Sequence, residues 1–355
     1  MACELYRAID LPVLQNRTFA TAELARACGA ADVVLVQDEA TGLVYNQAFD
    51  VSKLVYDADY QNEQAHSPHF QRHLDAVEGV LAQFFAGRSL VEVGCGKGYF
   101  LEMLCDRGYA VTGVDPSYEG QSEHVICAPF SRELNIRADG VILRHVLEHI
   151  ADPCAFLREI AEANAGGLIY IEVPCFDWII DRMAWFDVFY EHVNYFRLDD
   201  FRRMFGTVLE SGRLFGGQYL YVVADLATLR TPGNDYEPVQ LPAAFQAGAQ
   251  LAAQALLAQP QRRVAVWGAS SKGVIYSLFL QRAGVPVDHV VDINPDKQGR
   301  FLPLSGICVS SPAQLLEAHP EGALILVMNS NYLSEIRQMT ADRYSYLAVD
   351  GVAVA

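Results

Sequence analysis

The chain has 355 residues, 43 acidic against 26 basic side chains, a formal net charge of -17 and 52% hydrophobic residues. This length and apolar content suffice for two or three domains, each with its own core. The acidic balance, without a run of basic residues, argues against a phosphate backbone as partner. We therefore expect no nucleic acid partner.

The cysteines and the apolar segments indicate the compartment. Residues 1–7 contain an acidic residue and no long apolar run, and no later segment reaches about 18 uninterrupted apolar residues. The eight cysteines include no Cys-x-x-Cys pair, which fits reduced, buried thiols better than disulfides or a zinc cluster. We expect a soluble cytoplasmic protein that is not exported and has no membrane partner.

The first half of the chain predicts a small β unit and then an α/β unit. Residues 1–75 alternate short apolar runs with turn-forming Asp, Gly and Asn, which indicates an irregular β structure. From Ser67 onward, apolar residues recur at spacings of three and four, as on one buried helix face. The pattern then predicts strands over 90–93, 110–114, 140–143 and 168–173, and helices over 98–107, 153–163 and 199–205. Strands separated by such helices indicate a doubly wound parallel sheet, closed by extended stretches over 207–213 and 218–224.

A second α/β unit follows a polar linker. Residues 230–237 are polar and contain a Pro-Gly pair, the strongest linker signal in the chain. The pattern next predicts a helix over 242–259, strands over 263–267, 289–291 and 323–328, and a helix over 272–283. We expect a smaller Rossmann-like domain that binds substrate. The predicted domains are residues 1–75, 76–229 and 230–355.

A glycine-rich loop follows the first strand of the central unit. Gly94, Gly96 and Gly98 stand between that strand and a helix, and Asp115 ends the next strand, 21 residues after Gly94. Glycines let a ligand approach the backbone, and a carboxylate placed there can accept hydrogen bonds from ribose hydroxyls. The pattern predicts a site for an adenosine-containing cofactor, with a purely structural glycine turn as the alternative.

The spacing of the glycines in this loop distinguishes between two kinds of cofactor. A dinucleotide fingerprint places its third glycine three positions after the second, whereas Gly96 and Gly98 are two apart. The loop resembles motif I of class I S-adenosylmethionine-dependent methyltransferases, and with Asp115-Pro116 and residues 144–149 at later strand ends the resemblance covers about residues 85–200. It implies S-adenosyl-L-methionine as cofactor, with glycines beneath its methionine part, Asp115 at its ribose and Glu92 acting indirectly on its amino group. The predicted cofactor-binding residues are Glu92, Gly94, Gly96, Gly98, Asp115 and Arg144.

A second glycine loop, residues 267–273, follows a strand and opens a helix in the C-terminal unit. Asp292 is the one acid that could serve a ribose there. An anion subsite for the substrate and a retained scaffold with an idle crevice are equally compatible with this pattern.

Three motifs together resemble the sugar C-methyltransferase family: residues 190–196 (YEHVNYF), the loop 267–273 (WGASSKG) and residues 292–299 (DINPDKQG). The resemblance spans nearly the whole chain. It implies a doubly wound class I methyltransferase core with a small N-terminal domain and a second Rossmann-like domain. It also implies methylation at carbon 3 of a nucleotide-linked 4-keto-deoxysugar, through an enolate formed by a base. The predicted catalytic residues are the base His192, its orienting or second proton-transfer partner Glu191, Tyr190, and Tyr60 from a lid over 56–62.

The sequence departs from the family at two places. A tyrosine is expected three positions before His192, where this chain has Phe189, so the hydroxyl that would polarise the ketone is in doubt. The family's N-terminal domain holds zinc through two Cys-x-x-Cys pairs, but Asp38 and Thr41 occupy the second pair. We therefore expect no metal, and an N-terminal unit held by packing.

Other interpretations stay open at this point. His192 could instead pack the loop between domains, and a structural role is at least as compatible with His149. The enzyme could methylate oxygen or nitrogen of a secondary metabolite, or the chain could be a non-catalytic scaffold. A nucleotide substrate requires arginines near the cleft, for which the sequence offers Arg144, Arg182, Arg202 and Arg203. We expect a small-molecule substrate, and a homodimer is common among Rossmann-type enzymes of this size.

Overall fold

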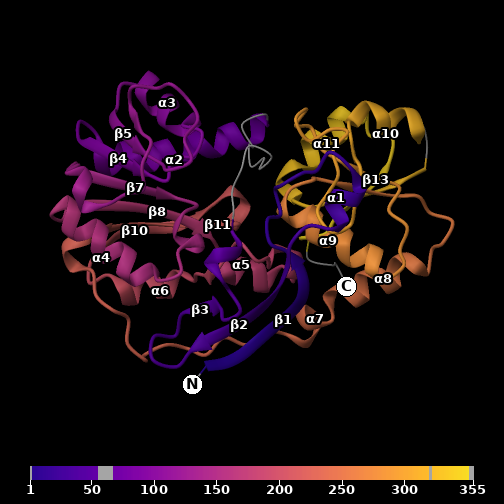
Figure 1. Ribbon diagram of the computed structural model, residues 1–355, viewed down its shortest axis with the longest axis horizontal. Coiled ribbons are helices and arrows are strands. Elements are labelled where there is room, and N and C mark those ends of the chain that lie inside the picture. The colour runs from indigo at the N-terminus through magenta and orange to yellow at the C-terminus, as the bar shows by residue number, and fades with distance from the viewer. Residues whose placement is uncertain (1, 55–66, 320–321, 352–355) are drawn as a thin grey trace.

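The central unit contains a seven-stranded sheet with the order β10-β11-β8-β7-β4-β5-β6. A computed structural model describes residues 2–54, 67–319 and 322–351 (Figure 1). The strands of this sheet are β4 (Ser89–Val93), β5 (Ala110–Val114), β6 (Val125–Ile126), β7 (Gly140–Arg144), β8 (Leu168–Pro174), β10 (Val208–Leu214) and β11 (Tyr219–Asp225). From β6 to β8 neighbouring strands pair in parallel, and β11 runs antiparallel to both β8 and β10. Because the strand order reverses between β4 and β7, their carboxyl ends border the crevice where such folds bind ligands.

Alternating side chains of the inner strands pack against helices on both faces of the sheet. Ile142 and Tyr170 share a core with the apolar face of α2 (Pro68–Phe85), which includes Leu74 and Leu81. Neighbouring strand residues point the other way and pack with Leu157 and Ile160 of α4 (Pro153–Asn164). The central unit also contains α3 (Tyr99–Asp106), α5 (Phe176–Asp181) and α6 (Leu198–Met204). The sheet is therefore doubly wound, as predicted.

Helix α2 begins where the sequence predicts it. The Ser67 side chain accepts hydrogen bonds from the backbone N–H groups of His69 and Phe70, and Pro68 occupies the first turn. Its buried face contributes about 1.5–3 kcal/mol for each large apolar side chain. The expected domain boundary at residues 75–76 falls inside this helix, so the central unit starts no later than Pro68 among the described residues.

The C-terminal unit is a second parallel sheet, with the order β14-β13-β12-β15-β16. Its elements are β12 (Val264–Trp267), α9 (Ser271–Arg282), β13 (His289–Val291), β14 (Val309–Ser310), α10 (Pro312–Ala318), β15 (Leu324–Val327), α11 (Leu333–Met339) and β16 (Ser345–Ala348). The helix predicted over 242–259 is two helices, α7 (Ala243–Gln246) and α8 (Gly248–Leu257). At their junction a Cβ on Gly248 would overlap the Trp185 ring, so glycine permits this close packing.

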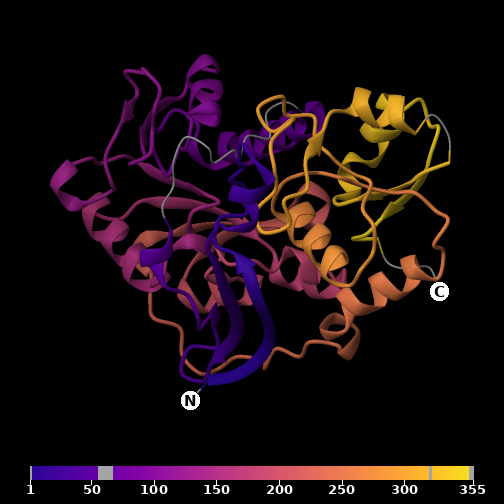
Figure 2. The same ribbon diagram turned by 45° about the vertical axis from the view of Figure 1, so that its right-hand side comes forward.

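The N-terminal unit is more regular than the sequence suggests. It is an antiparallel sheet of β1 (Ala2–Pro12), β2 (Ala30–Asp38), β3 (Val44–Asn46) and β9 (Asn194–Tyr195), accompanied by the short helix α1 (Ala22–Arg26). Figure 2 shows this indigo segment between the central and C-terminal units. Its last strand, β9, comes from the connection that carries Glu191 and His192. The predicted lid residues 56–62, including Tyr60, lie outside the described residues.

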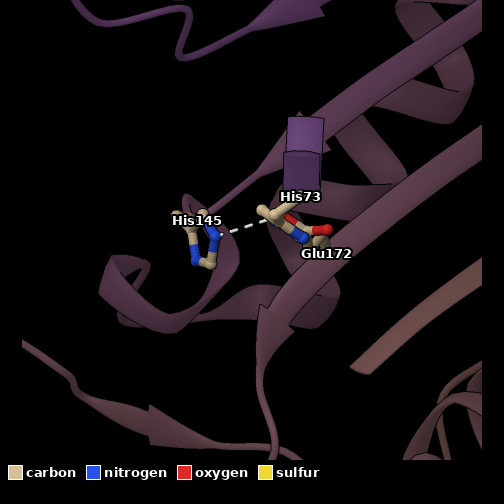
Figure 3. A group of neighbouring side chains, drawn as sticks. All are labelled: His73, His145 and Glu172. Atoms are coloured by element: carbon tan, nitrogen blue, oxygen red, sulfur yellow. Dashed lines mark hydrogen bonds and ion pairs between the residues drawn. The ribbon is translucent and has the colours of Figure 1, made fainter. Parts of the chain in front are cut away.

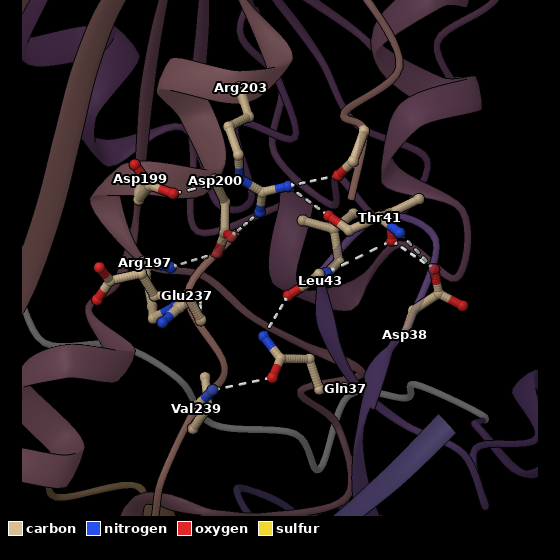
Figure 4. Close-up of polar contacts among 12 residues, drawn as sticks. Gln37, Asp38, Thr41, Leu43, Arg197, Asp199, Asp200, Arg203, Glu237 and Val239 are labelled. Carbon is tan, nitrogen blue, oxygen red and sulfur yellow. Dashed lines mark hydrogen bonds and ion pairs between the residues drawn. The ribbon is translucent and has the colours of Figure 1, made fainter. Parts of the chain in front are cut away.

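A polar network surrounds Asp38 and Thr41, at the positions where the resemblance led us to expect a pair of thiolates (Figure 4). Asp38 Oδ1 accepts hydrogen bonds from the backbone N–H of Thr41 (2.7 Å) and from its hydroxyl (2.8 Å). Arg203 donates to the carbonyl oxygens of Thr41 and Gly233 and to Asp200 Oδ1 (2.6 Å). Gln37 adds contacts at 2.9 Å with the carbonyl of Gly42 and the N–H of Val239. The N-terminal unit is thus held by a buried polar network in addition to the expected packing.

Further expectations concern the state of the cysteine thiols, a metal site and membrane-spanning helices. All eight cysteines are free; Cys95 and Cys175 are buried as expected, whereas Cys3, Cys127 and Cys308 are exposed. Among the described residues, the groups close enough to share a metal ion lie in the central unit and include no cysteine. No described helix combines the length and apolar character needed to cross a bilayer.

We expect Arg203→Met to destabilise the protein strongly. Arg203 is 6% exposed and Asp200 is fully buried, so this substitution leaves a buried carboxylate without its cation. Such a loss typically costs about 3–5 kcal/mol. Urea denaturation measures the effect, with Arg202→Met as the exposed control, expected within about 0.5 kcal/mol of wild type. Equal stabilities of the two variants would show that the network is dispensable.

Candidate active site

The glycine loop leaves β4 in a conformation that only glycine adopts easily. Gly94, Gly96 and Gly98 have φ angles of 76°, 56° and 80°. A Cβ on Gly94 would overlap the Val146 side chain, so the loop packs closely against the segment after β7. A Cβ on Gly96 would meet no atom within 4 Å. The backbone at Gly96 is therefore open to a ligand.

Asp115 lies beside this loop, as the strand ends predict. Its Oδ2 accepts a hydrogen bond from the N–H of Gly96 (2.8 Å), and its Oδ1 accepts one from the N–H of Ser117 (2.8 Å). A carboxylate has about four acceptor sites, so both oxygens can still accept from ribose hydroxyls. The contact joins the ends of β4 and β5 into one surface.

Glu92 is a buried acid of β4 with an unsatisfied oxygen. It is 2% exposed, and Oε2 has no hydrogen-bond donor among the described residues. Burial raises the pKa of Glu92 to about 7, against the attraction of Arg144 and with a further contribution from Asp115. S-adenosylmethionine carries an ammonium group and a ribose, so an orphaned acid beside an open glycine and Asp115 fits it chemically.

Arg144 is engaged inside the protein. Its Nη2 donates to Glu172 Oε1 (3.1 Å), and its guanidinium lies 4.3 Å from the centre of the Phe100 ring. Its side chain is 9% exposed. The structure thus places Arg144 under the crevice in an ion pair, and its predicted contact with the cofactor stays a prediction.

A buried cluster that the sequence did not predict surrounds Glu172, on β8 (Figure 3). Glu172 Oε1 lies 3.2 Å from His73 Nε2 and 3.1 Å from His145 Nε2, and Oε2 accepts from the Tyr170 hydroxyl (3.0 Å). Although burial alone would raise it, Arg144 and the two histidines hold the pKa of Glu172 well below its usual range. The cluster therefore contains a stable buried anion.

His145 lies between two carboxylates. Its Nδ1 is 3.4 Å from Glu148 Oε1, and its Nε2 faces Glu172. Burial alone would lower its pKa, but hydrogen bonds with Glu148 and Glu172 raise the pKa of His145 to about 9. Its φ of 53° is unusual for a residue other than glycine and marks a constrained position. The sequence sign of this cluster was the run of residues 144–149. Within that run, a binding role was predicted for Arg144 alone.

The predicted catalytic residues come together only in part. His192 is 9% exposed, and its ring centre lies 4.1 Å from that of Phe189 and 4.9 Å from that of His149. Glu191 Oε2 instead accepts from the N–H of Gln15 (2.8 Å), in the N-terminal unit. The Tyr190 hydroxyl accepts from the N–H of Asp50 (2.8 Å) and donates to its carbonyl (3.3 Å). Glu191 and Tyr190 thus attach the N-terminal unit to the segment that carries His192.

Side chains of the C-terminal unit form hydrogen bonds with the second glycine loop. Asp292 Oδ2 accepts from the N–H of Ala269 (2.8 Å), and the buried Lys297 donates to Ser270 Oγ (2.8 Å) and to the Ala269 carbonyl (3.2 Å). Lys272 forms an ion pair with Asp187 of the central unit (3.1 Å). Because both lysines already have partners, the geometry favours an idle crevice over an anion subsite.

We expect His145 to make stability depend on pH between about 6.5 and 9. Its raised pKa means that the stabilisation is complete below its usual pKa of 6.5 and is lost as pH rises through about 9. The loss is about 3–4 kcal/mol, because one pKa unit corresponds to about 1.4 kcal/mol. Urea denaturation across this range should show a flatter profile for His145→Asn, since asparagine tolerates a positive φ. The exposed His124→Asn should keep the wild-type profile, and a wild-type profile in His145→Asn would refute the assignment.

Comparison with curated proteins finds methyltransferases. Over 111 residues the chain is 30% identical to a ubiquinone biosynthesis O-methyltransferase of Caulobacter vibrioides, covering 26% of this chain and 44% of that protein. Over 119 residues it is 29% identical to a probable S-adenosylmethionine-dependent methyltransferase of Mycolicibacterium smegmatis, covering 30% and 45%. The chain thus spans less than half the length of these curated relatives.

Solved structures similar to this chain are also methyltransferases. A 1,6-didemethyltoxoflavin-N1-methyltransferase of Burkholderia thailandensis is 17% identical, with a TM-score of 0.34, and covers 45% of this chain and 79% of that one. A magnesium protoporphyrin IX methyltransferase of Synechocystis PCC 6803 is 17% identical, with a TM-score of 0.33, and covers 44% and 80%.

Two family models match the two α/β units. Residues 61–208 match the model of a methyltransferase domain, and residues 247–346 match that of a C-methyltransferase C-terminal domain. The first match covers the glycine loop, Asp115 and the parallel strands from β4 to β8. The chain therefore carries a class I methyltransferase domain of the kind that uses S-adenosylmethionine, followed by a C-methyltransferase C-terminal domain.

Proposed function

We propose that this protein is an S-adenosylmethionine-dependent C-methyltransferase that acts on a small metabolite. The observation that carries the proposal is the succession of a methyltransferase domain and a C-methyltransferase C-terminal domain in one chain. A buried histidine, His192, lies between α5 and α6 of the methyltransferase unit. This combination supports carbon as the acceptor atom.

His192 acts as the general base in this proposal. When bound, the cofactor supplies an electrophilic methyl group. Burial and the neighbouring His149, His145 and Lys272 lower the pKa of His192 well below its usual value, so the imidazole is neutral and can accept a proton at neutral pH. Removing a proton from the carbon beside a ketone leaves an enolate, whose carbon is the nucleophile for methyl transfer.

A nucleotide-linked keto-deoxysugar is the proposed substrate class, on the resemblance of the three sequence motifs. The arginines expected to receive its phosphates contribute less than predicted, because Arg144 and Arg203 are buried in ion pairs. Arg202 is exposed, and Arg182 is half-buried. A keto metabolite with fewer negative charges fits the acidic chain equally well.

A second candidate function is O-methylation. Several curated relatives carry the name ubiquinone biosynthesis O-methyltransferase, although they are only about 30% identical to this chain and the matches cover about a quarter of it. In that case His192 would deprotonate a hydroxyl group. The open glycine loop beside Asp115 argues against a non-catalytic scaffold.

We expect Asp115→Asn to weaken binding of S-adenosylmethionine about 10–100-fold. The substitution removes the negative charge of a side chain that accepts hydrogen bonds from the loop and, in this proposal, from the ribose hydroxyls. Isothermal titration calorimetry measures the affinity. Asp292→Asn is a matched control, since Asp292 makes the equivalent pair of hydrogen bonds in the second loop, to Ala269 and Asn294. Unchanged affinity in Asp115→Asn, or an equal loss in Asp292→Asn, would refute the cofactor site.

We expect His192→Gln to lower turnover by about 10²–10⁴ while leaving S-adenosylmethionine affinity unchanged. The wild type should also exchange the proton beside the ketone of a nucleotide-linked 4-keto-deoxysugar with deuterated solvent, when an unreactive cofactor analogue is bound. The exposed His124→Gln serves as control. Methylation of the sugar without such exchange would favour an oxygen acceptor, and full activity of His192→Gln would exclude it as the base.

A further inference from the structure

Glu148 is a buried carboxylate that pairs with His145 through one oxygen only. It lies in the 3₁₀ turn η3 (Leu147–His149) after β7, and its side chain is 1% exposed. Neither oxygen has a hydrogen bond of good geometry among the described residues, and His145 Nδ1 is 3.4 Å from Oε1. An acid left in this state is costly, so its presence at a crevice calls for a functional explanation.

The proposed base is within reach of this acid. One carboxylate oxygen of Glu148 and one ring nitrogen each of His149 and His192 all lie within 4.8 Å of one another. His149 Nδ1 donates a hydrogen bond to the Glu191 carbonyl (2.8 Å), which fixes its ring. A carboxylate and two imidazoles are thus gathered at the junction of two segments that lie over 40 residues apart.

Backbone contacts hold the two segments in register. The N–H of Val193 donates to the Glu148 carbonyl (2.8 Å), and the Asn194 amide donates to the carbonyls of Ile150 (2.6 Å) and Leu147 (3.4 Å). These bonds flank His192 on one side and Glu148 on the other. The distance between acid and base is therefore set by the fold rather than by mobile side chains alone.

Glu191 is placed differently from its sequence neighbour. Its side chain is directed to the N–H of Gln15 in the N-terminal unit (2.8 Å). Glu191 lies in a turn that precedes β9, and its side chain and that of His192 face different partners. The resemblance to the sugar C-methyltransferase family gave Glu191 the orienting role, and the geometry gives it an anchoring one.

We propose that Glu148 is the positioning carboxylate of His192 and stabilises the imidazolium that forms when His192 takes the substrate proton. The inference rests on the proposed function. The carbon–hydrogen bond of the substrate breaks, its electron pair stays on the substrate as the enolate, and a nitrogen–hydrogen bond forms on His192. The arrangement parallels the acid that supports the histidine of a hydrolase triad.

The charged groups around His192 favour this role for Glu148. The titratable groups that face it are Glu148, His149 and His145 from the segment after β7, Lys272 from α9 and Tyr195 from β9. Of these, Glu148 is the one carboxylate, and the histidines and Lys272 all disfavour a positive charge on His192. Removing Glu148 should therefore make His192 a weaker base.

The decisive comparison is between Glu148→Gln and Glu191→Gln in the full-length protein. In Glu148→Gln we expect kcat to fall about 10–10³-fold, with KM and S-adenosylmethionine affinity within about threefold of wild type. The acid limb of its pH–rate profile should move to lower pH, because the imidazolium has lost its anion. Glu191→Gln should retain the wild-type acid limb. The reverse pattern would overturn the proposal, and Glu148→Asp, expected to recover part of the rate, replaces Glu148→Gln if the latter does not fold.

A readout without turnover separates this inference from the proposed function. Proton–nitrogen NMR of the histidine rings follows the titration of His192, whose pKa should be lower in Glu148→Gln than in wild type and unchanged in Glu191→Gln. An inactive wild type with this NMR result would refute the function but support the pairing. An active wild type with an unchanged His192 titration in Glu148→Gln would overturn the pairing. Stoichiometric Zn²⁺ bound by wild type and lost in Glu148→Gln would assign the three side chains to a metal and also overturn it.

Discussion

The buried carboxylate of Glu172 is the interaction on which the active-site region depends. It receives Arg144 from the end of β7, His145 from the following turn, His73 from α2 and the Tyr170 hydroxyl from its own strand. Burying an anion is unfavourable unless several donors surround it. These four donors therefore fix two neighbouring strand ends and a helix relative to one another, and the crevice forms above them.

The sequence predicted the parts of this structure that depend on local pattern. The 3.6-residue period of α2, the alternation of the inner strands and the glycine loop with Asp115 all follow from residues close together in the chain. The partners of Glu148, Glu191 and Tyr190 could not be predicted in this way. Each depends on a contact between distant segments, such as the Tyr190 hydroxyl on the backbone of Asp50, which no periodicity encodes.

The N-terminal unit illustrates how one kind of cross-link can be replaced by another. Where the sequence resemblance led us to expect cysteines, Asp38 closes a tight turn through Thr41, and Arg203 connects that turn to the central unit. A metal site holds its ligands by a few strong bonds that depend on the redox and metal state of the solution. Hydrogen bonds to carbonyl oxygens have no such dependence, so this unit keeps its attachment under either condition.

Strand β9 connects the segment that carries His192 to the sheet of the N-terminal unit. It begins two residues after His192 and pairs with β3, while the N–H of Asn46 donates to the Val193 carbonyl (2.7 Å). A rigid rotation of the N-terminal sheet would therefore displace His192 along with it. In such an arrangement, any closure of the N-terminal unit would also move His192, the proposed base.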